Sequence, residues 1–269
     1  MKKTFKILAL LSCLMAMFTI ISCKNETPFN YIVELSEEEK NSPVVFMLHG
    51  YGSNAENFKE LTHFEKEALP RGYSVVYVSS SAAGWGSGAG LDKSDDVKAL
   101  CQLAKKLQKE FHFDKKRTYV AGFSNGGFMS HRLAVQGKGT FSACICAGGD
   151  MSKSVWIRKK PKTKISFFQI SGEKDDAIPK HSNGTAEASL DPAIEDVLEY
   201  YALSDGLNLE NPAETTIGNG SILTKYSAKN VKNQVWHLFV KDGRHAWPSI
   251  QYNNIDVNNL ILDFLDSLQ

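Results

Sequence analysis

Short apolar runs alternate with longer amphipathic stretches along most of the chain. The short runs are rich in β-branched and aromatic residues, which is typical of buried strands. They predict strands over residues 31–35, 44–48, 74–78, 117–121, 141–147, 164–170 and 234–240. The amphipathic stretches predict helices over residues 55–69, 94–111, 126–135, 192–204 and 255–268.

The predicted helix at 94–111 shows the spacing that one buried helix face requires. The apolar residues on this face are Val97, Leu100, Leu103, Ala104 and Leu107. Strands that alternate with such helices predict an α/β domain, with a parallel sheet covered by helices on both faces. No internal repeat or second domain is visible. The Gly- and Ser-rich stretch 79–90 predicts a loop that exposes one aromatic residue, Trp85.

The first residues of the chain predict an export signal. Lys2, Lys3 and Lys6 precede an uncharged apolar run at 7–21, which is shorter than the roughly 20 residues that span a membrane. The run ends in Ile-Ile-Ser-Cys, which looks like a bacterial lipobox with Cys23 as the lipidated residue. An ordinary signal peptide that happens to end in a cysteine is the alternative.

These boundaries predict a signal peptide at 1–22 and a tether and leader at 23–42, with the main domain at 43–269. We expect an exported protein, lipid-anchored to the bacterial cell envelope at the outer membrane. The choice between the periplasmic and the surface side stays open. Acyl chains contribute about 0.8 kcal/mol of membrane affinity per buried CH₂ group, so several acyl chains on Cys23 would anchor the protein stably to a membrane.

Composition and charge narrow the classes of partner. Hydrophobic residues make up 42% of the chain and charged residues 23%, which is ordinary for a globular protein. Loss of residues 1–22 removes three of the 31 basic residues and none of the 30 acidic ones, which leaves a formal charge of −2. We therefore expect no nucleic-acid partner, and membrane contact only through the lipid anchor.

The cysteines left after export are Cys101, Cys144 and Cys146. Cys144 and Cys146 alternate in an apolar run, so we expect both to be buried on one face and not bridged to each other. The chain has no CxxC pair and no spacing typical of metal ligands. We expect no metal and no cofactor.

The clearest chemical signal is the hexapeptide GFSNGG at residues 122–127, between a predicted strand and a predicted helix. This is the context of a G-x-S-x-G nucleophile elbow, in which a sharp turn raises the hydroxyl of Ser124 at the carboxyl edge of the sheet. Small residues on either side let the helix pack closely on the strand. The alternative is a glycine-rich turn in which Ser124 only caps the helix.

A nucleophilic serine needs a base, and His245 is the best placed histidine. It lies in the segment DGRHAWP, between the last predicted strand and the last predicted helix. The chain order Ser, acid, His is the order found when such a site is built on an α/β sheet. The other histidines lie in contexts that do not point to Ser124, although His181 in a polar loop stays open. They are His49, His63, His112, His131, His181 and His237.

The acid that orients the histidine should follow the strand at 164–170. Glu173, Asp175 and Asp176 all lie in the loop after that strand, and their position alone does not choose among them. The acid would hold the imidazole tautomer and stabilise the imidazolium without taking the proton itself.

The segment LHGYG at 48–52 follows the first long apolar strand. In such a site, an amide of this loop joins the amide after the nucleophile to form an oxyanion hole. The candidate donors are therefore the backbone amides of Tyr51 or Gly52, and of Asn125. We expect His49 to brace the loop through a hydrogen bond.

These segments in this order, HGYG, GFSNGG, Asp-x-x-x-Pro and GRHAWP, resemble one branch of the α/β hydrolases, the polyhydroxybutyrate-depolymerase-like and feruloyl-esterase-like branch. The resemblance runs from about residue 44 to the end of the chain and implies a single-domain α/β-hydrolase catalytic domain. It implies Ser124, Asp175 and His245 as the catalytic triad. The branch also carries an Asp-Asp-Val at the start of the helix after its tryptophan, matched by residues 95–97.

The resemblance implies a secreted serine carboxylic ester hydrolase without a cofactor. Its expected substrates are feruloyl or acetyl esters on plant polysaccharide, or polyhydroxyalkanoate-type esters. Trp85 and Trp247 are expected to offer stacking surfaces to the substrate, with ordinary packing as the alternative. Ser171 and Arg244 depart from the pattern of the branch. A serine peptidase of the same fold and a non-catalytic surface binding protein remain the alternative functions.

Overall fold

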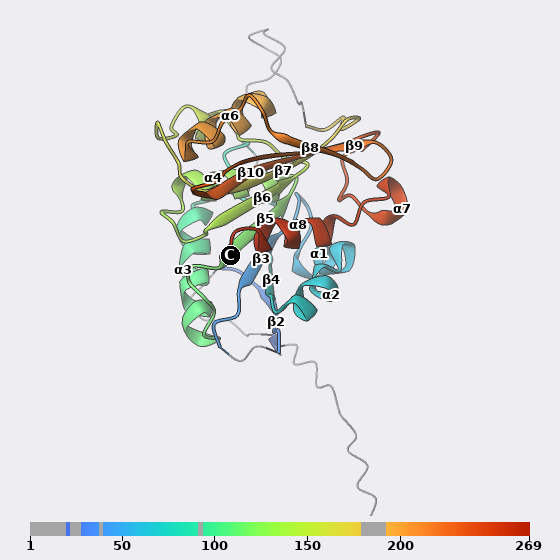
Figure 1. Ribbon diagram of the computed structural model, residues 1–269. Coiled ribbons are helices and arrows are strands. Elements are labelled where there is room, and N and C mark those ends of the chain that lie inside the picture. Colours follow the sequence, from blue (N-terminus) through green and yellow to red (C-terminus); the bar gives the residue numbers. More distant parts are fainter. Residues whose placement is uncertain (1–19, 22–27, 38–39, 91–93, 179–191) are drawn as a thin grey trace, which may run out of the picture.

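The computed structural model describes residues 20–21, 28–37, 40–90, 94–178 and 192–269, and it confirms the α/β class (Figure 1). Its strands form one sheet in the order β1-β2-β4-β3-β5-β6-β7-β10-β9-β8. The strands are β1 (Ile20–Ile21), β2 (Tyr31–Glu34), β3 (Val44–Leu48), β4 (Ser74–Val78), β5 (Thr118–Phe123), β6 (Ala143–Ala147), β7 (Ser166–Gly172), β8 (Ala213–Ile217), β9 (Ser221–Ala228) and β10 (Val231–Val240). The six strands from β4 to β10 in this order are parallel, and the strands outside them are antiparallel.

Helices cover both faces of the sheet (Figure 1). Side chains of α3, α4 and α6 join the buried cluster on one face, and those of α1, α2 and α8 join the cluster on the other. The helices are α1 (Ala55–Thr62), α2 (Phe64–Ala68), α3 (Asp96–Glu110), α4 (Asn125–Gln136), α5 (Lys153–Trp156), α6 (Ile194–Asp205), α7 (Ile250–Asn253) and α8 (Val257–Asp266), with a 3₁₀ turn at Leu69–Arg71.

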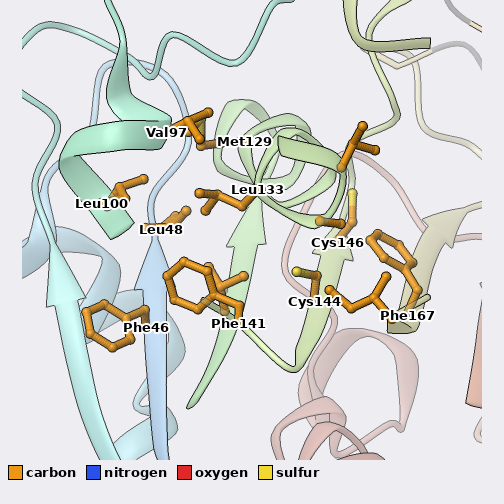
Figure 2. Packing of buried hydrophobic residues seen from close by; sticks show 14 of the residues in the cluster. Phe46, Leu48, Val97, Leu100, Met129, Leu133, Phe141, Cys144, Cys146 and Phe167 are labelled. Atoms are coloured by element: carbon orange, nitrogen blue, oxygen red, sulfur yellow. The ribbon is translucent and has the colours of Figure 1, made fainter. Parts of the chain in front are cut away.

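Alternation along the strands divides the core into these two clusters, because successive side chains of a strand point to opposite faces. On β6, Cys144 and Cys146 face the α3–α4 side together with Phe167 of β7, as Figure 2 shows, while Ile145 faces the other side. Both cysteines are buried and unbridged, which confirms that prediction.

The structure corrects the predicted elements in two places. The helix expected at 55–69 is broken at His63, whose φ of 45° is left-handed and ends α1. The hairpin β8–β9 was not predicted, since β8 is exposed along almost its whole length and shows no apolar alternation. The strand predicted at 31–35 is confirmed as β2, which pairs with β4, so the sheet includes part of the segment expected as tether and leader.

Candidate active site

Ser124 occupies a strained turn between β5 and α4. Its backbone has φ 53° and ψ −117°, a conformation that L residues rarely adopt and that is common at functional sites. The surrounding glycines explain why the chain turns so tightly here. A Cβ atom added at Gly122 would lie 2.1 Å from the carbonyl oxygen of Gly126, and one at Gly126 would lie 2.2 Å from that of Leu48. The predicted elbow therefore depends on the absence of side chains at both positions.

The hydroxyl of Ser124 is aimed at His245 and not at the helix. Its side chain makes no capping bond to α4, which rules out the helix-cap interpretation. The Oγ atom lies 2.9 Å from His245 Nε2. On the other side of the ring, Nδ1 lies 3.0 Å from Asp175 Oδ2. A carboxylate can only accept, so Nδ1 donates to Asp175 and Nε2 is left to accept the hydroxyl proton.

Asp175 is the acid that the structure brings to His245. Its side chain is only 3% exposed, and its Oδ1 accepts from the backbone amides of Ala177 and Ile178 at 2.9 Å each. Burial opposes the charged form, but the hydrogen bonds from His245 and these two amides outweigh it and lower the pKa of Asp175 below its usual value. The carboxylate is thus held charged and in place.

The two neighbouring acids do not reach the imidazole. Glu173 is exposed and accepts from the backbone amide of Asp242 at 2.9 Å. Asp176 is exposed as well. Contact with His245 therefore selects Asp175 from the three acids, which their positions in the sequence could not do.

His245 is packed between two segments of the chain. Its ring lies 5.1 Å from the ring of Phe123, measured between centroids, and a Cβ added at Gly148 would lie 3.5 Å from it. Its side chain is 22% exposed, so one edge of the site remains open to solvent. The residue before the nucleophile and the loop after β6 thus fix the orientation of the base.

The loop after β3 lies against the nucleophile, since a Cβ added at Gly50 would be 3.4 Å from the Cβ of Ser124. The amide of Gly52 already donates to the carbonyl of Ala83 at 2.6 Å, so the structure removes Gly52 from the candidate oxyanion donors. Within the described residues, the amides of Tyr51 and Asn125 make no such bond to another loop. These two amides remain the candidate pair.

His49 braces this loop, as predicted. It is fully buried, its Nδ1 lies 2.7 Å from the carbonyl oxygen of Gly50, and its Nε2 accepts from the amide of Ser80 at 3.0 Å. Burial lowers the pKa of His49, against the opposing hydrogen bond to Gly50. The ring is therefore a neutral tie between two loops.

The structure contradicts the expected stacking role of the two tryptophans. Trp85 is 0% exposed, and its Nε1 donates to the carbonyl of His49 at 2.9 Å. Trp247 is 7% exposed, packs edge-on against Phe58 and donates to Asn258 Oδ1 at 3.1 Å. Neither ring presents a face to a ligand. Each is packed in the core, where its indole N–H is hydrogen-bonded within the protein.

The exposed aromatic ring at the site is Tyr51, which sequence reasoning considered only for its amide. Its side chain is 57% exposed. The ring lies over Gly84, where an added Cβ would be 2.7 Å from Tyr51 Cδ2 and 2.8 Å from Asn125 Oδ1. The sequence did hold a signal of this role, because Tyr51 is an aromatic residue within the HGYG segment of the candidate oxyanion loop.

Two polar side chains that sequence reasoning did not assign a role hold the loop at 79–90. Asn125 Oδ1 accepts from the amide of Trp85 at 2.6 Å, and Asn125 Nδ2 donates to Ser87 Oγ at 3.0 Å. Asp96 is buried at the start of α3 and accepts from the amide of Gly86 at 2.7 Å. The second acid of the Asp-Asp-Val segment therefore ties the loop to α3.

The remaining histidines of the described chain are not at the site. His131 is fully buried against Phe167 and Tyr201, and His237 lies 2.7 Å from Ser171 Oγ. His63 is half-buried and His112 exposed. His181, Pro179 and Cys23 lie outside the described residues.

The described residues contain no group of three or more His, Cys, Asp or Glu side chains that could hold a metal ion. None of the helices described has the length and hydrophobicity needed to cross a bilayer.

A parallel sheet with a serine on a strand–turn–helix elbow, followed along the chain by an acid and a histidine, defines an α/β hydrolase. The chain matches the BD-FAE family over residues 32–211 and belongs to that family.

The relatives of the chain are distant in sequence. The chain is 27% identical over 143 residues to the bifunctional acetylxylan esterase/xylanase XynS20E of Neocallimastix patriciarum, and 24% identical over 219 residues to feruloyl esterase B of Piromyces equi. These matches cover 51% and 77% of this chain but 20% and 40% of the relatives, so the chain spans less than half of either protein.

Among solved structures, the fold is similar to that of an acetyl xylan esterase from Aspergillus awamori. The TM-score is 0.67 at 12% identity, and the match covers 94% of this chain and 99% of the other. At this identity the similarity concerns the fold.

Proposed function

We propose that the chain is a serine carboxylic ester hydrolase that works without a cofactor. The observation that carries the proposal is the continuous set of hydrogen bonds from Ser124 Oγ through His245 to Asp175, at 2.9 and 3.0 Å. A serine hydroxyl is a weak nucleophile unless a base within hydrogen-bond distance removes its proton.

In this mechanism, Ser124 Oγ attacks the ester carbonyl while its proton passes to His245 Nε2. The negative charge that develops on the carbonyl oxygen is stabilised by the amides of Tyr51 and Asn125. One such donor is worth about 2.7–4 kcal/mol of transition-state stabilisation. The C–O bond to the alcohol then breaks, and His245 gives its proton to the departing oxygen, which leaves an acyl group on Ser124.

Water completes the cycle. His245 removes a proton from the water as it attacks the acyl-enzyme, and then returns that proton to Ser124 Oγ when the acid is released. Asp175 stays ionised throughout and stabilises the imidazolium form of His245. The lowered pKa of Asp175 supports this role.

We propose acyl esters carried on plant polysaccharide, feruloyl or acetyl, as the substrate class, with polyhydroxyalkanoate-type esters next. The similarity to a bifunctional acetylxylan esterase/xylanase and to a feruloyl esterase supports this substrate class. The exposed ring of Tyr51 replaces Trp85 and Trp247 as the residue that would contact the acyl group or a sugar.

We also propose export and lipid anchoring of the protein through Cys23, with residues 1–22 as the signal peptide. The support is the sequence alone, in which three lysines precede an uncharged apolar run that ends at a small residue and a cysteine.

Ser124→Ala tests the catalytic proposal. Alanine keeps the Cβ and removes the nucleophile, so hydrolysis of methyl ferulate, acetylated xylan and p-nitrophenyl acetate should fall to background. The melting temperature should stay within about 2 °C, because a surface hydroxyl contributes little packing. A fluorophosphonate probe should label the wild type and not the variant.

Hydrolysis by Ser124→Ala within about tenfold of the wild-type rate would show that the nucleophile lies elsewhere. Failure of the wild type to react with the fluorophosphonate would support a non-catalytic binding protein. Cleavage of an acyl-peptide anilide in preference to all three esters would support a peptidase.

A further inference from the structure

The segment between α5 and β7 is unusually basic. Residues 153–164 contain six lysines and arginines and no acid, in a chain that has 31 basic and 30 acidic residues in all. Four of these cations occupy alternate positions, and we refer to them together as the basic row. They are Arg158, Lys160, Lys162 and Lys164.

The basic row lies on one side of its segment. All four of its members are exposed, whereas the alternate residues Lys159 and Thr163 are half-buried and Ile165 is buried. Arg158 belongs to the turn that follows α5, since its amide donates to the carbonyl of Val155 at 3.1 Å. The three lysines follow on a segment without regular secondary structure, in which Pro161 is exposed as well. Alternate residues of a fully extended chain are about 6–7 Å apart, so the row spans at most about 20 Å.

Contacts on the inner side fix the segment against α6. The hydroxyl of Tyr200 donates to the carbonyl of Lys160 at 2.9 Å, and the amide of Thr163 donates to Ser204 Oγ at 3.1 Å. Lys159 places its Nζ 3.3 Å from the centre of the Trp156 ring. The cations of the row are therefore displayed from an ordered backbone, which lowers the entropic cost of binding a ligand.

The protein offsets the charges of the row only in part: among the described groups, Lys164 acts on the carboxylate of Asp205, where its charge opposes the rise of the Asp205 pKa. Within the described residues, none of the four makes an ion pair, and the exposed Asp196 and Glu199 of the neighbouring α6 do not bridge to them. Backbone spacings of at most about 6–7 Å between alternate residues are shorter than the Debye length of about 8 Å at physiological ionic strength, so neighbouring charges of the row repel one another. A ligand with regularly spaced negative charges would remove this repulsion.

The row begins close to the candidate active site. The chain leaves β6 through Gly149, where an added Cβ would lie 2.8 Å from the carbonyl oxygen of Ser124, and passes through α5 into the row. Because β7 runs parallel to β6, the segment must then descend from the carboxyl edge of the sheet to its amino edge. The row thus leads away from the site along the flank of the domain.

We propose that the basic row binds a carboxylate-bearing polysaccharide. A line of cations matches a linear polyanion better than it matches a bilayer, which is a plane and favours several apolar side chains beside the cations. Within residues 153–164, all of which are described, Ile157 is the one large apolar side chain that is exposed, at 67%. Single-stranded nucleic acid would need exposed aromatic rings for stacking, and Trp156 is half-buried beneath Lys159.

Binding to the row does not require catalysis. That the bound polymer also carries the ester that Ser124 attacks rests on the proposed function. The test therefore measures binding and hydrolysis separately.

The experiment compares the full-length chain with two variants of equal charge. The row variant carries Arg158→Gln, Lys160→Gln, Lys162→Gln and Lys164→Gln. The control variant carries Lys98→Gln, Lys105→Gln, Lys109→Gln and Lys115→Gln, four exposed lysines elsewhere. Affinity for polygalacturonic acid is measured by calorimetry at about 50 and 200 mM salt, beside neutral xylan, anionic phospholipid vesicles and single-stranded DNA.

We expect wild type and control to bind polygalacturonic acid with similar affinity, more weakly at high salt, and neutral xylan much less well. The row variant should bind at least about tenfold more weakly, with p-nitrophenyl acetate hydrolysis unchanged in both variants. Equal loss of binding in the row and control variants would overturn the proposal, as would absence of binding by the wild type. Tighter binding of vesicles or DNA than of polygalacturonic acid would also overturn it.

If the row variant melts more than about 5 °C below the control, the double variant Lys160→Gln/Lys162→Gln replaces it, compared with Lys105→Gln/Lys109→Gln. Loss of polygalacturonic acid binding in an otherwise active double variant supports the row. Loss of ester hydrolysis by Ser124→Ala with binding retained separates this inference from the proposed function.

Discussion

Ser124 stores backbone strain that its neighbours must hold. A non-glycine residue in such a conformation costs on the order of 1–3 kcal/mol. The amide of Ser124 donates to the carbonyl of Ala147 at 2.8 Å, and its carbonyl accepts from the amide of Phe128 at 3.0 Å. These bonds to β6 and α4 fix the residue on both sides, so that its side chain meets His245 without further rearrangement.

Asp175 should matter far more than the acid beside it. Asp175→Asn keeps the size of the side chain but allows the wrong imidazole tautomer, and loss of the orienting acid from such triads lowers kcat by ~10⁴. Asp176 is exposed and makes no contact with His245, so Asp176→Asn should leave kcat within about twofold. Turnover of p-nitrophenyl acetate by both variants at neutral pH decides it. A larger loss at Asp176 would contradict the assignment.

The ring of Tyr51 should select among substrates without affecting the chemistry of small ones. Tyr51→Ala keeps the backbone amide but removes the exposed aromatic surface beside the nucleophile. We expect KM for methyl ferulate to rise about three- to tenfold, in line with ~0.5–1.5 kcal/mol for an aromatic pair. The kcat for p-nitrophenyl acetate should stay within about twofold, and Tyr51→Phe should behave like the wild type. Equal loss on both substrates would mean that Tyr51 only supports the oxyanion loop.

At the scale of elements, α4 links the nucleophile to a buried polar cluster. His131 of α4 lies 3.2 Å from Gln169 of β7 and 3.3 Å from the hydroxyl of Tyr201 of α6. Gln169 also donates to the carbonyl of Gly149 at 2.8 Å, in the loop that packs against Ser124. One helix therefore carries the strained serine at its start and a fully buried histidine in its middle.

This histidine should make the fold sensitive to acid. Burial lowers the pKa of His131 to about 3 against the hydrogen bond that its ring donates to Gln169 Oε1, whereas the unfolded chain takes up a proton near pH 6.5. Its stabilising contribution is therefore complete above about pH 6.5 and is lost as the pH falls from there toward 3. Between about pH 6.5 and 4.5 the loss is roughly 2–3 kcal/mol.

His131→Gln should lower stability at neutral pH but flatten its dependence on pH. Urea unfolding at about pH 7.5 and 4.5 measures both, with the exposed His112→Gln as the control. The comparison between variants is needed because burial raises the pKa of Asp205 to about 6, and that group loses stability in the opposite direction, as the pH rises. Identical pH dependence in His131→Gln and wild type would show that another group is responsible.

At the scale of the whole molecule, the proposed lipid anchor and the basic row give the domain two attachments. The row lies between α5 and β7, whereas β2, which lies within the expected leader, pairs with β4 at one end of the run of parallel strands. An anchored chain would thus carry its polyanion-binding surface on a part of the sheet away from the tether. Polymer could then approach the site without crossing the leader.

Cys23→Ala should release the protein from the membrane fraction. Without the thiol there is no site for the lipid, and a single signal sequence without acyl chains gives no stable attachment. Fractionation of cells of a lipoprotein-processing bacterium, followed by mass spectrometry of the mature N-terminus, measures the result. The kcat of the released protein should equal that of the wild type, because Cys23 is not one of the triad residues Ser124, Asp175 and His245. A soluble wild-type protein whose Cys23 thiol can be alkylated would contradict the prediction.

Local patterns were enough to predict most of the fold. The parallel strands from β3 to β7 are apolar because both of their faces are covered, and this burial is visible in the sequence as compact β-branched runs. The nucleophile elbow was visible for the same reason, since its glycines are required by contacts within a few residues. The β8–β9 hairpin was not predicted because an exposed edge strand needs no apolar face. The GNG turn at 218–220 was a signal of this hairpin.

The sequence by itself determined the class of the protein and the serine and histidine of its candidate site, because each lies in a short segment whose chemistry is local. Only the tertiary structure decided what depends on contacts between distant segments. Asp175 is distinguished from Asp176 by its distance to a ring seventy residues away, and Gly52 is excluded because Ala83 occupies its amide. Trp85 is buried and Tyr51 is exposed because of how their loops fold over the sheet. The residues that neighbour them in the sequence do not indicate this difference in exposure.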